Sequence, residues 1–146
     1  MAAAAACGGG SGETETPGVP EPGGRLAFVS FREGDQEIFA KDLPDGDEIN
    51  LTNDPSDDFD PDISEDGSKV AFVSNRGGRL HIYVMGVDGG GVRLIDGTEG
   101  AQTPRWSRDG TKIAYSTGGA GVTVIDRDGG NARVLLKADG GSGPAP

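Results

Sequence analysis

The acidic run at 53–67, "NDPSDDFDPDISEDG", holds the residues whose types and spacing come nearest to a metal site. Asp62, Ser64 and Asp66 alternate there as in the first half of a calcium-binding EF-hand loop. That loop needs a bidentate glutamate at position 12, and Val73 stands there inside an apolar run. The sequence therefore favours an ordinary connecting loop and predicts no metal and no cofactor.

The same run offers a different chemistry through its clustered carboxylates. Asp57, Asp58 and Asp60 carry negative charge on a short connecting segment. A charge run usually forms a solvated face, but such a loop at one end of a molecule is also where a protein partner binds. These three residues are our candidates for a partner-facing loop.

His81 is the single histidine, so any catalytic triad built on histidine must use it. It begins an apolar run, and the sequence contains no Gly-x-Ser-x-Gly segment of the kind that presents a nucleophilic serine. We therefore expect His81 to be structural, and we expect Trp106 to pack in the core. No catalytic residue is predicted.

Cys7 is the single cysteine, which excludes a disulfide within the chain. Its surroundings, "AAAAACGGGSGE", are similar to the lipid-attachment site of bacterial lipoproteins. The five alanines are shorter than the apolar core of a signal peptide, and no basic residue precedes them. Two interpretations stay open: a lipid-attachment cysteine in a chain whose true start lies upstream, or a plain flexible tail.

Composition limits the class of partner. With 24 acidic and 13 basic residues the formal net charge is −11, which argues against nucleic acid and anionic membrane surfaces. No stretch approaches the roughly 20 apolar residues of a membrane span. The 27 glycines recur at regular offsets, as turn residues do, and indicate an ordered, turn-rich protein with disordered ends.

A repeated segment organises the chain. "SEDGSKVAFVS" at 64–74 and "SRDGTKIAYST" at 107–117 begin 43 residues apart, and Leu26–Ser30 aligns with the apolar part of both. A second apolar run and an Asp-Gly pair follow each copy. Counting back from Pro61 places a degenerate copy of the opening strand at 17–23, where extra prolines weaken it.

Each unit is predicted to form four short strands. Runs of four or five residues rich in Val, Ile, Phe and Tyr, bounded by Asp-Gly, are typical of strands joined by hairpins. In the repeated turn, the serine hydroxyl should bond a backbone N–H about two residues on, and glycine should adopt the left-handed conformation. A four-stranded meander of roughly this length, repeated, is typical of a propeller blade.

The predicted fold is therefore all-β: a partial, open β-propeller of about three four-stranded antiparallel blades. "VAFV" and "LAFV" are apolar on both faces, which fits strands covered by sheets on either side. The expected organisation is a disordered tail (1–16), blade 1 (17–60), blade 2 (61–103), blade 3 (104–137) and a second disordered tail (138–146).

On these residues the chain resembles the TolB-like, WD-repeat-like β-propeller repeats. Their pattern is an apolar residue or Trp, Ser-Pro-Asp-Gly, a hydrophobic-Ala-Phe strand, and an Ile-Tyr-Val strand before Asp-Gly-Gly. It appears here at 63–74 with 82–84, and again at 106–115. Glu65 and Arg108 stand where the family often has proline.

The resemblance implies a fold and a setting. Such blades occur in periplasmic and secreted bacterial proteins, in the Tol–Pal envelope machinery and beside peptidase domains of the prolyl-oligopeptidase type. We therefore expect a non-enzymatic protein-interaction module that binds a protein or peptide and lies in the periplasm or outside the cell, with a lipid anchor if Cys7 is a lipid-attachment site. The alternative is the propeller fragment of an enzyme, a peptidase or a polysaccharide lyase, without its catalytic domain. Because a closed propeller has 4–8 blades, three units predict self-association or missing blades.

Overall fold

The computed structural model describes residues 24–32, 34–118 and 121–137, which form eleven strands in three antiparallel sheets. Blade 1 holds β1 (Gly24–Ser30), β2 (Glu37–Leu43) and β3 (Glu48–Asn50). Blade 2 holds β4 (Asp58–Ile63), β5 (Lys69–Ser74), β6 (His81–Gly86) and β7 (Arg93–Leu94). Blade 3 holds β8 (Ala101–Trp106), β9 (Lys112–Thr117), β10 (Gly121–Asp126) and β11 (Arg133–Lys137).

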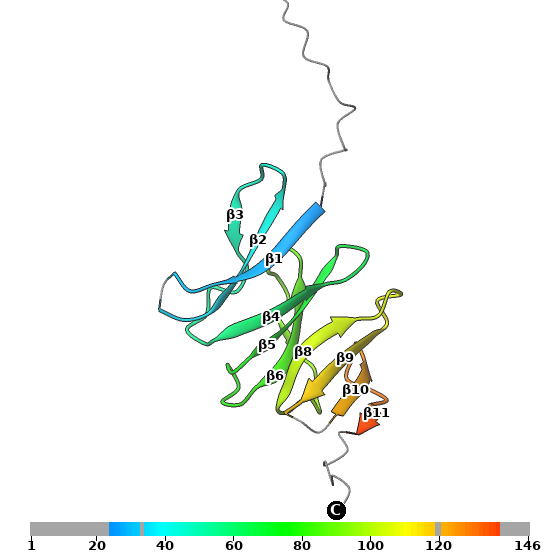
Figure 1. Ribbon diagram of the computed structural model, residues 1–146. Coiled ribbons are helices and arrows are strands. Elements are labelled where there is room, and N and C mark those ends of the chain that lie inside the picture. The colour runs from blue at the N-terminus through cyan, green and yellow to red at the C-terminus, as the bar shows by residue number, and fades with distance from the viewer. Residues whose placement is uncertain (1–23, 33, 119–120, 138–146) are drawn as a thin grey trace, which may run out of the picture.

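Each strand pairs with its neighbour in sequence, so every blade is a meander, and the blades follow one another like a fan in Figure 1. The predicted all-β, open stack of three blades is confirmed, since none of the three sheets closes on another. Blades 2 and 3 begin at Asp58 and Ala101, slightly upstream of the prolines at which the sequence units were started. The degenerate strand expected at 17–23 and both expected tails lie outside the described residues.

The repeated turn forms as a hairpin, but its bonds differ from the expected ones. Asp66 Oδ1, not the serine, accepts the backbone N–H two residues on, from Ser68 at 3.0 Å. The Ser64 hydroxyl oxygen accepts the N–H of Lys69 at 3.0 Å, across the hairpin. The longer carboxylate spans the tight turn, which leaves the hydroxyl to bridge the two strands. Gly67 is left-handed, with φ 70°, as predicted.

The core consists of two layers, one in each joint between blades. Between blades 1 and 2 it contains Ile38, Ala40, Leu51, Val70, Phe72, Tyr83 and Met85. Between blades 2 and 3 it contains Ala71, Ile82, Val84, Ile95, Ala101, Ile113, Tyr115 and Ile125. Strand β5 therefore contributes side chains to both layers. Its four residues 70–73 are all 0% exposed, which confirms that "VAFV" is covered on both faces.

The equivalent strand β1 of blade 1 is covered on one face only. Leu26 is 48% exposed there, although its equivalent in β5, Val70, is 0% exposed. Among the described residues no sheet lies against that face of blade 1, and none lies against the outer face of blade 3. The stack therefore ends in two uncovered sheet faces.

Candidate functional site

The three carboxylates predicted to face a partner are each engaged within the chain. Asp57 joins blade 2 to blade 1, because its Oδ1 accepts the backbone N–H of Gln36 at 3.2 Å. Its own N–H donates to Asn75 Oδ1 at 3.1 Å. Asp57 thus fixes the start of blade 2 against the preceding blade.

Asp58 is completely buried and forms an ion pair with Arg76, with 2.7 Å between Oδ2 and Nη2. Burial raises the pKa of the Asp58 carboxyl above its usual value, and the Arg76 guanidinium opposes that rise. The same guanidinium lies over the rings of Phe72 and Tyr83, 5.4 Å and 5.3 Å from their centroids. Asp58 therefore anchors a cation inside blade 2.

Asp60 lies at a β-bulge where the register between β4 and β5 shifts, and its φ is 53°. Thr103 occupies the equivalent bulge in β8, with φ 48°, and its N–H donates to Asp60 Oδ2 at 3.2 Å. The bulges of neighbouring blades are thus bonded to each other. The partner-contact role of Asp57, Asp58 and Asp60 stays a prediction beside these structural roles.

The residues that resemble half an EF-hand loop also bond within the chain. Asp62 Oδ2 accepts the backbone N–H of Trp106 at 2.6 Å, and Asp66 accepts from the Ser64 hydroxyl at 2.7 Å. Within the part of the chain that the structure describes, no group of three or more His, Cys, Asp or Glu side chains could hold a metal ion.

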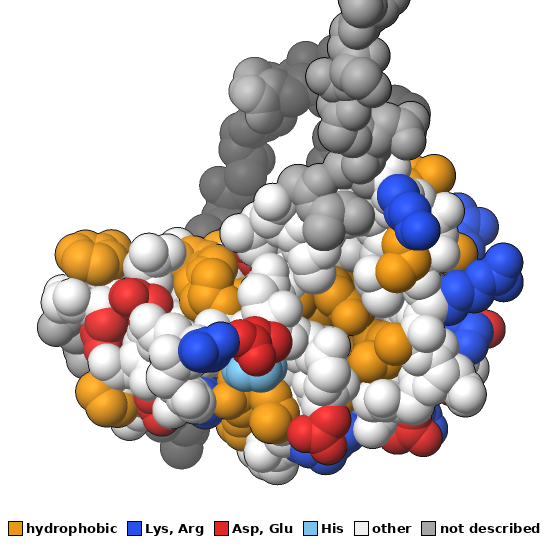
Figure 2. Space-filling view, turned by 90° about the horizontal axis from the view of Figure 1, so that it is seen from below, with side chains coloured by type: hydrophobic (Ala, Val, Ile, Leu, Met, Phe, Trp, Pro, Cys, Tyr) orange, Lys and Arg blue, Asp and Glu red, His pale blue; other side chains and the backbone are white. Residues whose placement is uncertain are grey.

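His81 begins β6 and pairs in register with Ser74. Its Nδ1 is buried without a hydrogen-bond partner, while part of the ring reaches the surface. In Figure 2 the ring is the pale blue area between a basic and acidic pair and a hydrophobic patch. Cys7, the candidate for lipid attachment, lies outside the described residues.

A cleft of about 290 Å³ opens between blades 2 and 3. Its charged lining is Lys69, Arg93 and Arg127, and its apolar lining is Val84, Met85 and Trp106. The turns that follow β4, β6, β8 and β10 all lie at this end of the stack, because the meanders alternate in direction. We call it the turn end; the loop after β5, with Arg79, lies at the opposite end.

A hydrogen bond to the backbone positions one cation of this cleft, Arg93. Arg93 Nη2 donates to the backbone oxygen of Arg127 at 2.7 Å, which bridges β7 of blade 2 and the last turn of blade 3. Both arginines and Lys69 are exposed. Three cations around one opening are notable in a chain with a formal net charge of −11.

A smaller hollow of about 70 Å³ adjoins the cleft and shares Lys69, Trp106 and Arg127 with it. Its other wall carries Asp66 and Asp109 from the repeated turns. The Ser64 hydroxyl and the Ser68 N–H lower the pKa of Asp66 to about 2, and Ser107 and Thr111 do the same for Asp109. The opening is therefore basic on one side and firmly anionic on the other.

Sequence reasoning missed this cleft. Its lining comes from β5, β6, β7 and β8 and from the turn after β10, and no local motif joins these segments. One signal was available: Lys69, Arg93 and Arg127 each begin a strand or stand beside an Asp-Gly turn. In a meander such positions meet at one end.

Comparison with known protein families assigns the family. The sequence model of one family, the TolB beta propeller domain, matches residues 4–145. The chain belongs to this family. No curated protein sequence matches the chain. Among solved structures, a putative TolB from Agrobacterium tumefaciens is 28% identical, with a TM-score of 0.69, and the match covers 77% of this chain and 45% of that one.

Two further structures define the range of the likeness. TolB from Acinetobacter baumannii is 26% identical, with a TM-score of 0.63, over 77% of this chain and 30% of that one. An oligogalacturonate lyase from Vibrio parahaemolyticus is 14% identical, with a TM-score of 0.54, over 81% of this chain and 32% of that one. The TolB-family chain described here spans less than half of the TolB chains it matches. None of its described residues lies in a helix long and apolar enough to cross a membrane.

Proposed function

We propose that this TolB-family chain is a non-enzymatic protein-interaction module of the bacterial cell envelope, and that the cleft at the turn end binds an acidic peptide segment of its partner. The observation that carries the proposal is the placement of Lys69, Arg93 and Arg127 around an apolar floor. Membership of the TolB family supports the envelope setting.

The lining of the cleft suits a short peptide with one acidic side chain. A volume of about 290 Å³ is at the small end of ligand pockets, enough for one or two side chains. Val84, Met85 and Trp106 supply apolar contact, and the guanidinium groups pair well with a carboxylate. The anionic wall at Asp66 and Asp109 would repel a second acidic group of the peptide. The site would therefore reject peptides whose second acidic residue falls beside that wall.

The enzyme alternative has a narrower basis. The oligogalacturonate lyase and a prolyl endopeptidase resemble the chain at 14% and 22% identity, a likeness that supports the shared propeller fold alone. Under this alternative, the chain would gain hydrolase or lyase activity only when its gene neighbours supply a catalytic domain. The sequence that flanks the gene separates the two: a neighbouring domain with a Gly-x-Ser-x-Gly segment would favour the enzyme, and further blades alone would favour the interaction module.

The binding test uses a fluorescein-labelled peptide selected from a random library on the purified chain. We expect selected peptides to carry an acidic residue, and we expect Arg127→Ser and Arg93→Ser each to weaken binding by about tenfold. Arg79→Ser is the matched control, because Arg79 pairs with Glu99 at the opposite end. Equal binding by all three variants would show that the cleft is not the site.

The envelope setting has its own test in Cys7. We propose that Cys7 carries a lipid in the native bacterium. Detergent-phase partitioning of the wild-type chain, lost in Cys7→Ser, is the expected result. Equal recovery of both forms in the cytoplasmic fraction would contradict it, without bearing on the peptide-binding cleft.

A further inference from the structure

The two uncovered sheet faces at the ends of the stack carry the same kinds of residue as the two faces that pack together in each existing joint. For each blade we call the face toward the following blade its forward face, and the face toward the preceding blade its rear face. Strand pairings place equivalent residues in register, so the two existing joints show what each kind of face contains. The uncovered faces are the rear face of blade 1 and the forward face of blade 3.

Forward faces share one pattern. In blade 2 the forward face is Ala71, Val73, Ile82 and Val84, which are 0–6% exposed beneath blade 3. The equivalent residues of blade 1 are Ala27, Val29, Ile38 and Ala40. Those of blade 3 are Ala114, Ser116, Val122 and Val124, which no described sheet covers. An alanine opens the row in all three blades, and aliphatic residues dominate the rest.

The one polar member of the uncovered forward face is compatible with burial. The Ser116 hydroxyl bonds the Gln102 carbonyl oxygen at 3.3 Å and lies 3.0 Å from the Thr103 hydroxyl. Its hydrogen-bonding needs are met within blade 3, so covering it leaves no orphaned polar group. The forward face of blade 3 can therefore receive another blade.

Rear faces share a second pattern, a bulky row with an aromatic residue in the middle strand. Blade 2 presents Val70, Phe72, Tyr83 and Met85 to blade 1, and blade 3 presents Ile113, Tyr115, Thr123 and Ile125 to blade 2. Blade 1 carries Leu26, Phe28, Phe39 and Lys41 on the face against which no described sheet lies. Phe39 is only 8% exposed there, because Phe28 stacks on it and the Arg32 guanidinium lies over its ring. Leu26 is 48% exposed, while its equivalents Val70 and Ile113 are 0% exposed.

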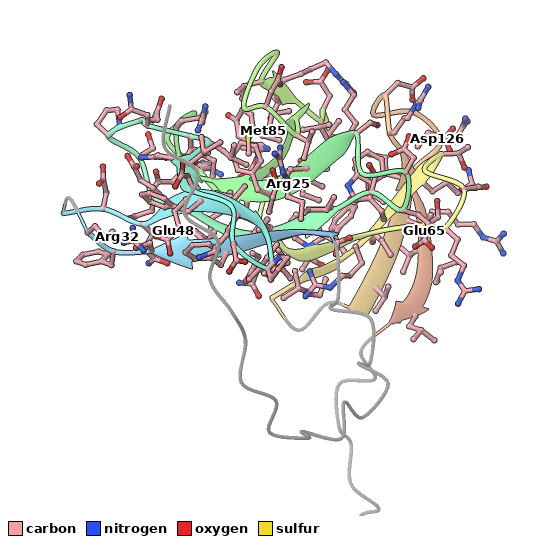
Figure 3. All side chains as sticks on the ribbon, turned by 90° about the horizontal axis from the view of Figure 1, so that it is seen from above. Arg25, Arg32, Glu48, Glu65, Met85 and Asp126 are labelled. Atoms are coloured by element: carbon pink, nitrogen blue, oxygen red, sulfur yellow. The ribbon has the colours of Figure 1, made fainter. Side chains whose placement is uncertain are left out.

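A polar contact at the edge of the joint is repeated as well. In blade 1, Arg25 pairs with Asp42 at 2.6 Å and reaches across the joint to donate to the Val87 carbonyl oxygen at 3.1 Å. Figure 3 labels Arg25 together with Met85, a residue of the rear face of blade 2, the blade to which Arg25 donates its hydrogen bond. Lys112 and Asp126 form the equivalent pair in blade 3, at the edge of its uncovered forward face. No sheet of the described residues lies against that face, so Lys112 has no such contact across a joint there.

We propose that a second copy of this chain covers both faces: blade 3 of each copy packs its forward face on the rear face of blade 1 of the other. Two identical joints then close a ring of six blades. Closed propellers have 4–8 blades, and two is the one number of three-bladed copies that falls within this range. A head-to-tail joint that closes gives a ring of defined size, whereas one that does not close gives an open filament.

The register of the new joint follows from the existing ones. Leu26 and Phe28 of one copy would lie over Ala114 and Val124 of the other, as Val70 and Phe72 lie over blade 1. Lys112 would approach the carbonyl oxygen of Leu43 of the second copy, the equivalent of Val87. Lys41 departs from the apolar pattern; its aliphatic stem can cover apolar surface while its ammonium group reaches solvent at the rim.

The first test is the mass of the full 146-residue chain in solution, measured by light scattering in a Cys7→Ser background to exclude an intermolecular disulfide. We expect twice 14.9 kDa, with a plateau as concentration rises. A stable species of 14.9 kDa would overturn the proposal, because the faces would then need another occupant. A mass that grows without a plateau would overturn the closed ring.

Two variants test the two faces separately. Leu26→Arg charges the rear face of blade 1, and Val124→Arg charges the forward face of blade 3; each should yield monomers. Val134→Arg is the matched control for the second variant. Val134 lies in β11 and is 53% exposed, and it pairs with Thr123, which belongs to the rear face of blade 3 and not to its forward face. Val134→Arg should remain dimeric, and equal dissociation by the control would contradict the proposed joint.

Mixing the two monomeric variants distinguishes a head-to-tail joint from a like-with-like one. The Leu26→Arg copy keeps an intact forward face, and the Val124→Arg copy keeps an intact rear face, so the mixture should form dimers with one good joint. Such recovery also shows that both variants are folded. Failure of the mixture to associate would overturn the head-to-tail arrangement. None of these positions lines the cleft, so peptide binding and dimer formation can fail independently.

Discussion

Trp106 is bonded twice to Asp62 across the joint between blades 2 and 3. Its backbone N–H donates to Asp62 Oδ2 at 2.6 Å, and its indole Nε1–H donates to the Asp62 backbone oxygen at 3.1 Å. Both residues lie in first strands of their blades, β4 and β8. One aspartate thus fixes the position of the large side chain that forms a wall of the cleft.

Removing the Asp62 carboxylate should weaken this joint. Asp62→Ala leaves the partly buried Trp106 N–H without its acceptor, and we expect it to lower the free energy of unfolding by about 1 kcal/mol. Urea unfolding followed by Trp106 fluorescence measures the loss. Asp62→Asn keeps an acceptor oxygen and should cost less; equal losses would show that the hydrogen bond is not the cause.

The buried ion pair of Asp58 gives a larger expected effect. Arg76→Met removes the guanidinium and leaves a fully buried carboxylate without its counter-charge. We expect the free energy of unfolding at neutral pH to fall by about 3 kcal/mol. The double variant Asp58→Asn with Arg76→Met should recover part of that loss, because no buried charge remains. A double variant less stable than Arg76→Met alone would contradict this account.

The repeated turns should make stability sensitive to acid. The pKa of Asp66 and of Asp109 is lowered from 3.8 to about 2 in the fold, chiefly by serine hydroxyls. A carboxyl whose pKa is lower folded than unfolded stabilises the fold above pH 3.8, and that stability is lost as the pH falls toward 2. The urea midpoint should drop over this window. The drop should be smaller in Asp66→Asn with Asp109→Asn, and NMR titration of both carboxyls gives their pKa values directly.

Gly89 offers a test of how closely neighbouring blades approach. Its φ is +84°, and a Cβ added there would lie 2.7 Å from the Leu51 carbonyl oxygen of the preceding blade. Gly67 has a similar φ of +70° but open space around it. Both alanine variants should suffer the backbone strain of about 1 kcal/mol, and Gly89→Ala should cost about 1 kcal/mol more through the contact. Thermal unfolding of the two alanine variants separates the cost of that contact from the backbone strain. Equal losses of stability in both variants would show that the blades can move apart freely.

The propeller architecture could be predicted because its signals are local. Strand β5, the Asp66-Gly67 turn and the Ala71 packing position are each encoded within a dozen residues and then repeated. Hairpin formation depends on the turn and on the strands beside it, so a sequence motif suffices to specify it. The uncovered stack ends followed from counting the units.

The roles of particular side chains could not be predicted in the same way. Asp58 was named for its place in a charged loop, and no sequence signal revealed that it is buried in an ion pair with Arg76. Ser64 was expected to cap the turn, but it bridges the two strands through Lys69 because Asp66 reaches the turn N–H first. These outcomes depend on competition between neighbouring groups for the same donor, which spacing along the chain does not reveal.

The sequence by itself determined three repeated meanders, their turns and the apolar rows on both faces of each sheet, since all of these arise from contacts between residues close in the chain. Only the tertiary structure decided how neighbouring blades pack against one another. That arrangement brings Lys69, Arg93 and Arg127 around one cleft, ties Trp106 to Asp62, and leaves a forward and a rear face uncovered. The physical reason is that each of these features joins residues of separate sheets, whose relative position is set by side-chain packing in the two joints rather than by any turn or strand alone.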